Sequence, residues 1–368
     1  MSSLAGKTLA EIGEFRLLQE VVLPMARKFD RETTAGDDCA FIQVGGALLA
    51  ATGDVGPRPV IQNLKAFRED WEAAGWLAVV ATASDVASAA AKPLFLTNCI
   101  DAPPELPVEC LAEFMHGYFR ALSAFGFSNG GGDLRHGPSL HARVFGVGIV
   151  EHGRRIGRSG AKPGDHLVVI GPAGLFMATF ILALSAEKEG LEGATSGAAV
   201  EAMRFPRPQL EAMRVLATRQ LISAASDTSD GLIGAIENIA IGSGCGFHLC
   251  LDDGHLAKEV TEAANAYEVH SPWNLFFAWG DWSIAAVVPA GRLAEFDDVC
   301  QANGFESRHL GEAVTEESLT AQMVASDGKF ALKVIRNENF VSRGFNAGID
   351  GHLDYILRTP LLLELGNS

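Results

Sequence analysis

The sequence has few cysteines and lacks any long apolar run. Its six cysteines are scattered, and none forms a CxxC pair, which argues against a structural zinc site and fits buried free thiols in a reducing compartment. No stretch is long enough to cross a bilayer, and residues 1–20 carry acidic residues without the apolar core of a signal peptide. We therefore expect a soluble, cytoplasmic protein with no membrane partner.

Positive charge is also scarce. The chain has 29 Lys and Arg residues against 45 Asp and Glu residues, a net charge of -16, which argues against nucleic acid as a partner. An acidic protein still binds nucleotides when metal ions screen the phosphates. The familiar nucleotide motifs are missing as well: there is no GxxxxGK[ST] loop, no HRD or DFG set, and no GxGxxG opening a helix after a strand. If the protein uses ATP, it must bind the nucleotide through a different kind of motif.

The length and composition predict two domains with substantial cores. The chain has 368 residues, of which 48% are hydrophobic. A polar stretch over residues 153–165 is the expected boundary, so the predicted domains are residues 1–152 and 153–368. Predicted strands alternate with helices in both domains, which favours α/β and α+β layers over a helical bundle.

Local patterns locate the individual elements. The turn at Gly45 and Gly46 predicts a hairpin, residues 128–132 are interpreted as a glycine-rich loop, and residues 228–231 as a turn before a helix. Helices are predicted over residues 9–28, 71–91, 108–125 and 232–243, and strands over residues 39–44, 47–52, 94–100, 140–150, 166–170, 247–251, 283–288 and 330–334.

Aspartates stand at the ends of predicted elements in five places. Mg²⁺ prefers hard oxygen ligands, and triphosphate chemistry often uses more than one such ion. Each turn alone is better explained by local capping than by metal binding, since Asp favours turns and helix starts. That the five acidic turns come together in space is therefore a hypothesis. The five turns are Gly36-Asp37-Asp38, Thr52-Gly53-Asp54, Ser84-Asp85, Gly131-Gly132-Asp133 and Asp227-Thr228-Ser229-Asp230-Gly231.

These turns, together with the opening Ile12–Phe15 and the segment Arg158–Asp165, resemble the aminoimidazole ribonucleotide synthetase superfamily. The resemblance is strongest to thiamine-monophosphate kinase. It runs from about residue 12 to residue 250, and although each motif is short, their order along the chain is specific.

The resemblance implies a two-domain PurM-like fold. Its N-terminal α/β domain forms a β-barrel with that of a second copy, giving a homodimer, and its C-terminal α+β domain covers the site. ATP and Mg²⁺ are the implied cofactors, with a small molecule as substrate. The metal candidates carried over are Asp37, Asp38, Asp54, Asp85, Asp133 and Asp230, and the ATP-binding candidates are Thr52, Gly131, Gly132, Arg158 and Ser229. No catalytic residue is implied.

The sequence departs from the family on the side of the acceptor. The kinases have an acidic residue and a His-Phe pair after the second motif, where this chain has Val55–Pro59. We therefore expect a poor thiamine-monophosphate kinase, or action on another phosphorylated or heteroaromatic molecule. Arg58 is either a phosphate ligand or a solvated loop charge. Trp279 and Trp282 either stack on a ring or pack in the core.

Three functions remain open. The first is an ATP-dependent kinase, and the second is a synthetase or cyclase of the same superfamily that acts through a phosphorylated intermediate. The third is a nucleotide-binding regulator without catalysis, against which the retained aspartates argue. Product analysis separates the first two, because a kinase leaves phosphate on its product and a cyclase releases it.

Overall fold

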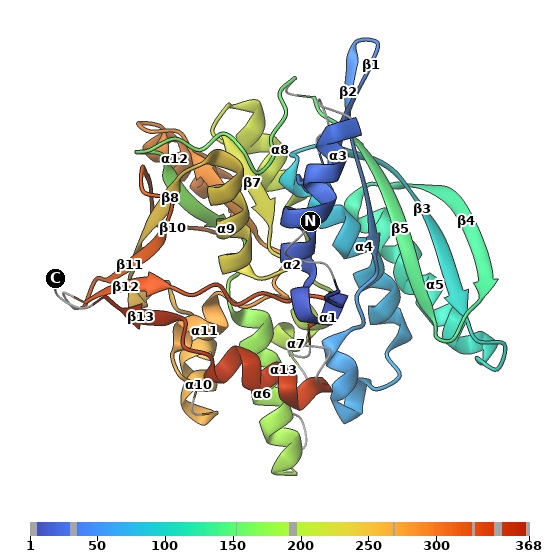
Figure 1. Ribbon diagram of the computed structural model, residues 1–368. Helices are drawn as coiled ribbons and strands as arrows, with labels where there is room; N and C mark the ends of the chain where they lie inside the picture. The colour runs from blue at the N-terminus through green and yellow to red at the C-terminus, as the bar shows by residue number, and fades with distance from the viewer. Residues whose placement is uncertain are drawn as a thin grey trace.

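The structure is a computed structural model that describes residues 6–29, 35–151, 153–190, 197–267, 269–325, 328–341 and 348–365. Strands β1 to β5 form one sheet and strands β6 to β13 form another, and Figure 1 shows the first at the right and the second at the left. The predicted two-domain arrangement of strands and helices is confirmed. Residue 152 lies outside the described ranges, so the boundary between residues 152 and 153 stays a prediction.

The N-terminal sheet has the order β1-β2-β5-β3-β4. The predicted Gly45-Gly46 turn joins β1 and β2 in antiparallel register, with Val44 opposite Ala47. Strand β2 continues past Thr52 to Val55, so Thr52 and Asp54 lie two residues apart on one face of the sheet. The strands are β1 (Ala40–Val44), β2 (Ala47–Val55), β3 (Lys92–Ala102), β4 (Ser128–His136) and β5 (His141–Ile149).

One sequence interpretation of this sheet is wrong. The glycine-rich stretch over residues 128–132 is not a loop but the start of β4, which pairs in parallel with β3. Glycine is needed there because the strands approach closely: a Cβ on Gly130 would lie 2.9 Å from the Leu96 carbonyl oxygen, and one on Gly132 would lie 2.3 Å from the Asn98 Oδ1 atom. Glycine in a strand therefore marks close backbone approach here, not a turn.

Helix α4 (Trp71–Ser88) is the central element of the molecule. It packs against β2, β5 and α5 (Val108–Phe125) within its own domain, and against β7, β9 and α8 of the other domain. Small apolar side chains cover all its sides, and most of them are buried, as expected of a helix that is buried all round. Position and direction of α4 therefore depend on both domains.

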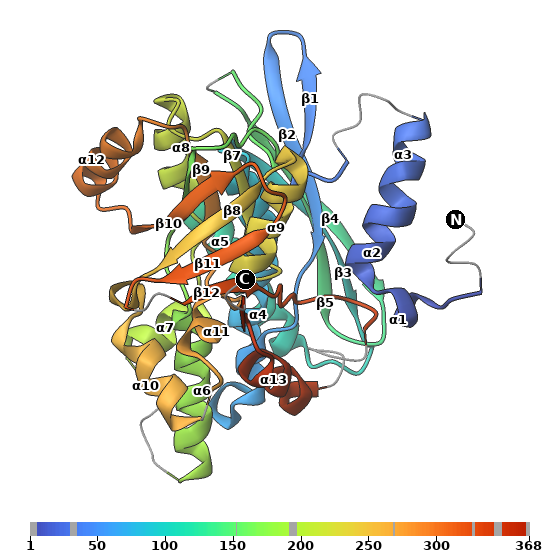
Figure 2. The same cartoon turned by 60° about the vertical axis from the view of Figure 1, so that its left-hand side comes forward.

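The N-terminal segment forms a broken helix over the predicted residues 9–28. Gly13, at φ 80°, separates α1 from α2. Figure 2 shows these helices apart from the second sheet. The parts are α1 (Leu9–Ile12), α2 (Glu14–Leu17), a π-helical turn η2 (Leu18–Val22) and α3 (Leu23–Phe29).

The second sheet has the order β13-β12-β11-β8-β10-β6-β9-β7, and Figure 2 shows β8, β10 and β11 side by side. Strands β7, β10, β11 and β13 are absent from the sequence prediction. The strands are β6 (His166–Ile170), β7 (Ala224–Asp227), β8 (Gly246–Leu251), β9 (Ile284–Val288), β10 (Ser307–Val314), β11 (Leu319–Met323), β12 (Lys329–Leu332) and β13 (Leu362–Glu364).

Helices lie on both faces of this sheet. One face packs mainly on α6, α9 and α10, and the other is buried against α4, α8 and α12. None of the helices in the described ranges is long and apolar enough to cross a membrane. The helices are α6 (Leu175–Lys188), α7 (Ala198–Arg204), α8 (Leu210–Thr218), α9 (Leu232–Ser243), α10 (Lys258–Ala266), α11 (Pro272–Phe276), α12 (Leu293–Asn303) and α13 (Gly348–Arg358), and the short 3₁₀ turns are η3 (Val60–Asn63), η4 (Lys65–Phe67) and η5 (Asp253–His255).

The crossing of α4 and α5 gives a test of the fold. A Cβ on Gly75 would lie 1.8 Å from the Phe114 carbonyl oxygen, and one on Gly117 would lie 1.9 Å from the Glu72 carbonyl oxygen. Gly75→Ala must separate the two helices, so we expect a loss of about 1–3 kcal/mol of stability, measured as a lower midpoint of thermal unfolding. Gly46→Ala is the control, since nothing lies within 4 Å of its Cβ position. Equal midpoints for both variants would contradict this packing.

Candidate functional site

Three carboxylates from distant parts of the chain meet in one place. Asp38 precedes β1, Asp85 lies in α4, and Asp227 ends β7. One carboxylate oxygen of each lies within 4.8 Å of the others, a spacing that suits a shared metal ion. Helix α4, packed between the domains, therefore brings an N-terminal and a C-terminal aspartate to the same point.

Asp38 links the two domains. Its Oδ1 atom lies 2.6 Å from the Arg158 Nη2 atom, and its Oδ2 atom accepts a hydrogen bond of 3.0 Å from the Asp227 backbone N–H. Arg158 also donates to the Gly36 carbonyl oxygen at 2.9 Å. Its backbone N–H donates to the Asp37 Oδ1 atom at 2.8 Å. The loop before β1 is thus fixed to the second domain by charge-assisted hydrogen bonds.

Asp85 is held by a hydroxyl group of the neighbouring strand. The Thr52 Oγ1 atom donates to the Asp85 Oδ2 atom at 2.6 Å. Burial raises the pKa of Asp85 well above its ordinary value, and the nearby charges of Asp227 and Asp38 raise it further. A carboxylate in this state is stabilised by a positive charge placed beside it.

Asp227 has an unsatisfied oxygen. The Ser229 Oγ atom donates to its Oδ1 atom at 3.1 Å, whereas its buried Oδ2 atom has no hydrogen-bond partner among the described residues. Burial first, and then the charge of Asp38, raises the pKa of Asp227 well above its ordinary value. An unpaired, buried carboxylate oxygen beside two further carboxylates fits a hard divalent cation such as Mg²⁺.

A cleft of about 690 Å³ opens beside this cluster, and Asp54 and Asp230 both line it. Burial raises the pKa of Asp230 to about 6 against the lowering effect of Arg336, and burial also raises the pKa of Asp54. The N-terminal segment contributes Glu14 to the rim, where its Oε2 atom accepts hydrogen bonds from the backbone and side chain of Asn339.

The rest of the cleft wall is largely apolar. Trp279 and Trp282 are 4% and 7% exposed, so they belong to the core and also line the cleft. Trp282 has φ 56°, a strained conformation for a bulky residue. The remaining apolar side chains come from α4, α6 and α7 and from the turn after β2, and include Ile61, Leu77, Phe176 and Met203.

The structure brings together some of the predicted residues and not others. Asp38 and Asp85 belong to the carboxylate cluster, and Asp54 and Asp230 line the cleft beside it. Thr52, Arg158 and Ser229 are hydrogen-bonded to the cluster itself. Asp37 adjoins the cluster, but its Oδ1 atom is taken by Arg158. Asp227 belongs to the fifth acidic turn but is not among the metal candidates that the resemblance implies. Its place at a strand end, before Thr-Ser-Asp-Gly, is a signal that could have identified it.

Asp133, Gly131 and Gly132 lie elsewhere. They belong to β4, which is separated from β2 by β3 and β5, roughly 14 Å at about 4.8 Å per strand. Figure 1 shows β4 at the right-hand edge, away from the second sheet. Asp133 is exposed and pairs with Arg135. Within one chain, these three residues do not reach the carboxylate cluster.

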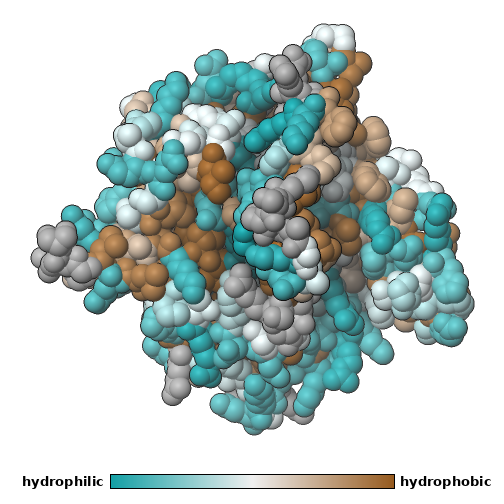
Figure 3. All heavy atoms as spheres, in the orientation of Figure 1, coloured by the Kyte–Doolittle hydropathy of each residue, from teal (hydrophilic) through white to brown (hydrophobic). Residues whose placement is uncertain are grey.

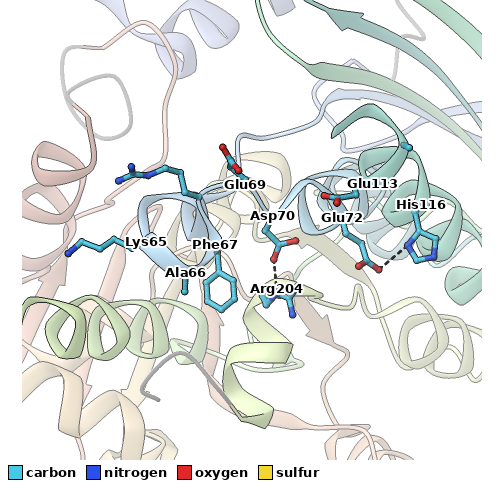
Figure 4. Close-up of a pocket in the computed structure, with 11 residues that line it drawn as sticks. Lys65, Ala66, Phe67, Glu69, Asp70, Glu72, Glu113, His116 and Arg204 are labelled. Carbon is cyan, nitrogen blue, oxygen red and sulfur yellow. Dashed lines mark hydrogen bonds and ion pairs between the residues drawn. The ribbon is translucent and has the colours of Figure 1, made fainter. Parts of the chain in front are cut away.

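A larger cavity of about 890 Å³ lies between η4, α5 and α7. Some of its polar side chains are already paired with one another: Asp70 pairs with Arg204, and Glu72 lies beside His116, as Figure 4 shows. Neither the three carboxylates nor the residues next to them line this cavity, whereas Asp54, Asp230, Arg158 and Ser229 all line the 690 Å³ cleft. Size alone therefore does not identify the site, and the 690 Å³ cleft is the stronger candidate.

The repulsion within the cluster predicts opposite effects of one substitution. Asp227→Asn removes a carboxyl group whose pKa is higher in the folded protein than in the unfolded chain. That difference lowers the stability of the metal-free wild type: the cost is largest above the folded pKa, shrinks as pH falls below it, and is gone below the unfolded pKa. We expect metal-free Asp227→Asn to melt at or above the wild-type temperature. Mg²⁺ should stabilise the wild type by about 2.7 kcal/mol at 100 times the dissociation constant, seen as a rise in melting temperature, and Asp227→Asn should lose that rise.

Asp298→Asn is the control for that experiment, because Asp298 is exposed on α12. It should keep the Mg²⁺ response. A full Mg²⁺ response in Asp227→Asn would show that the cluster is not where the ion binds.

Comparisons with known proteins agree with this arrangement. The family profile of AIR synthase related protein, N-terminal domain, matches residues 36–150, and that of the C-terminal domain matches residues 162–324. The thiamine-monophosphate kinase of Salmonella typhimurium is 32% identical over 257 residues, which cover 65% of this chain and 72% of the relative. That of Aquifex aeolicus is 27% identical over 306 residues, which cover 83% and 94%.

A solved structure shares the fold. AaThiL complexed with AMPPCP and TMP superposes with a TM-score of 0.70 at 22% identity, covering 88% of this chain and 98% of that one. The resemblance seen in the sequence motifs is therefore confirmed over both domains. This chain belongs to the thiamine-monophosphate kinase family of the AIR synthase-related proteins, and it has their two-domain PurM-like fold.

Proposed function

We propose that this protein transfers the γ-phosphoryl group of ATP to a small phosphorylated, heteroaromatic molecule and requires Mg²⁺ to do so. The observation that carries the proposal is the carboxylate cluster of Asp38, Asp85 and Asp227 at the end of a cleft with apolar walls. Family membership supports it, as does the AMPPCP, an ATP analogue, in the similar AaThiL structure. A reaction that consumes ATP also suits the cytoplasmic location expected from the sequence.

The cluster and its neighbours take separate roles in this proposal. Asp38, Asp85 and Asp227 bind Mg²⁺, and Asp54 and Asp230 complete the acidic end of the cleft. The ion, when bound, neutralises charge on the phosphates. The hydrogen bonds from Thr52, Arg158 and Ser229 orient the three carboxylates before any ligand arrives.

The apolar wall of the cleft suits the acceptor. Trp279, Trp282 and Phe176 give aromatic surfaces for a flat ring. The acceptor's phosphate then lies toward Asp54, where the γ-phosphoryl group arrives. The unusual turn after β2 still leads us to expect that thiamine monophosphate is a slow substrate.

We also propose that the protein is a homodimer built through the N-terminal sheet. The sheet is open in a single chain. The face opposite α4 carries exposed apolar side chains, with Phe95 and Phe145 exposed by 40% and 45% and Ile42 and Val44 by 47% and 56%. Figure 3 shows hydrophobic surface at the β1–β2 hairpin, at the upper right. A second copy, completing a barrel, covers this face.

A dimer would also explain the predicted site residues that lie far from the carboxylate cluster in a single chain. Gly131, Gly132 and Asp133 lie on the edge strand β4, too far from the cluster of their own chain. We propose that they contribute to ATP or metal binding in the site of the second copy.

The kinase reaction predicts specific products. Incubation with Mg²⁺ and ATP should convert a phosphorylated heteroaromatic acceptor into its diphosphate, with one ADP formed for each product, as followed by chromatography and ³¹P NMR. Thiamine monophosphate is the first acceptor to test, with thiamine as the unphosphorylated control. Release of inorganic phosphate in place of a diphosphate product would identify the synthetase or cyclase instead. Turnover of thiamine monophosphate on the order of 1 s⁻¹ or faster would contradict the expected slow rate.

The proposed dimer predicts the molar mass of the protein in solution. Multi-angle light scattering at micromolar concentration should give twice the mass of the 39.0 kDa chain. Phe145→Glu places a charge on the apolar face and should produce monomers without unfolding. A monomeric wild type would rule out the proposed barrel.

A further inference from the structure

The cleft that takes the acceptor is lined by three arginines, and one of them is free. Arg158 is paired with Asp38, and Arg204 is paired with Asp70 and Glu201. Arg58 also lines the cleft but makes no hydrogen bond or ion pair with any described residue. The cleft therefore contains one guanidinium group whose charge the protein itself leaves unused.

The turn that carries Arg58 is firmly held. The Gly56 N–H donates to the Ala142 carbonyl oxygen at 2.8 Å, and a Cβ on Gly56 would lie 2.9 Å from the Ala78 Cβ atom. Pro57 and Pro59 restrict the backbone on both sides of Arg58, and Pro59 is buried. The backbone of Arg58 is thus fixed at the edge of the cleft, while its exposed side chain remains free to meet a ligand.

The chemistry of the proposed reaction needs a cation at this place. Attack by a phosphate acceptor brings two anionic phosphates together, and the ions at the carboxylate cluster serve the ATP side. Arg58 follows Asp54 by four residues, and both line the same cleft, so its unpaired charge is available to a phosphate bound in that cleft. A guanidinium group binds a phosphate with two parallel hydrogen bonds.

We propose that Arg58 is the specificity-determining residue that binds the phosphate of the acceptor, so that the enzyme selects aromatic monophosphates over the corresponding alcohols. The inference rests on the proposed function. An oxygen of the bound acceptor phosphate forms a bond to the γ-phosphorus of ATP, and the bond between that phosphorus and the β,γ-bridging oxygen breaks. ADP leaves with the electron pair of that bond, and the acceptor becomes a diphosphate.

Paired ligands test this assignment directly. Calorimetry with Mg²⁺ and AMPPCP present compares thiamine monophosphate with thiamine, which differ only in the phosphate. The wild type should bind the monophosphate more tightly. Arg58→Ala should weaken binding of the monophosphate on the order of 10- to 100-fold, while leaving the affinities for thiamine and for Mg²⁺ with AMPPCP within about twofold. Arg58→Lys should weaken binding of the monophosphate less than Arg58→Ala does, because lysine keeps the positive charge but cannot donate two parallel hydrogen bonds to the phosphate.

Arg68→Ala is the matched control, because Arg68 is an exposed arginine that lines the other cavity, and it should behave as the wild type. The inference is overturned if Arg58→Ala weakens thiamine and its monophosphate equally, if it matches Arg68→Ala, or if the wild type does not prefer the monophosphate. Failure of the kinase proposal shows separately, as the absence of a diphosphate product from the wild type.

Discussion

Mutual repulsion among three carboxylates is the constraint around which the molecule is organised. One carboxylate oxygen each of Asp38, Asp85 and Asp227 lies within 4.8 Å of the others in a mostly buried setting, and desolvation and like charge both oppose the ionisation of Asp85 and Asp227. Nothing in the cluster itself favours this arrangement without a cation. The surrounding structure imposes it, through helix α4 packed between two domains and through Arg158, which ties the loop before β1 to the second domain. The packing of both domains therefore holds three like-charged side chains close together.

The same packing explains why the cleft has both acidic and apolar walls. Helix α4 supplies Asp85 to the cluster near its C-terminal end and small apolar residues, among them Leu77 and Ala81, to the cleft wall. Strand β2 supplies Thr52 and Asp54 and then turns into Val55–Pro59, which carries the unpaired Arg58. One helix and one strand thus contribute both to the acidic residues, which suit Mg²⁺ and phosphates, and to the apolar wall, which suits an aromatic acceptor.

The sequence predicted much of this, because its signals were local. The Gly45-Gly46 hairpin, the helix ending at Phe125 before Gly126, and strand His166–Ile170 all appear as expected. What failed depended on pairing between distant segments: residues 128–132 form a strand only because β3 accepts glycine at close range. Motif order placed Asp38, Asp54, Asp85 and Asp230 in one region, but local pattern cannot show that Asp227 faces Asp38 or that β4 lies at the far edge.

The central claim is that the three carboxylates hold the divalent cation that serves ATP. A crystal of the protein with Mn²⁺ and AMPPCP tests it most directly, because anomalous scattering locates the ion without assumption about its ligands. The account predicts a peak within about 2.5 Å of carboxylate oxygens of Asp38, Asp85 and Asp227, in contact with the phosphates of AMPPCP. Bound AMPPCP with its only Mn²⁺ ions away from these three residues would contradict it.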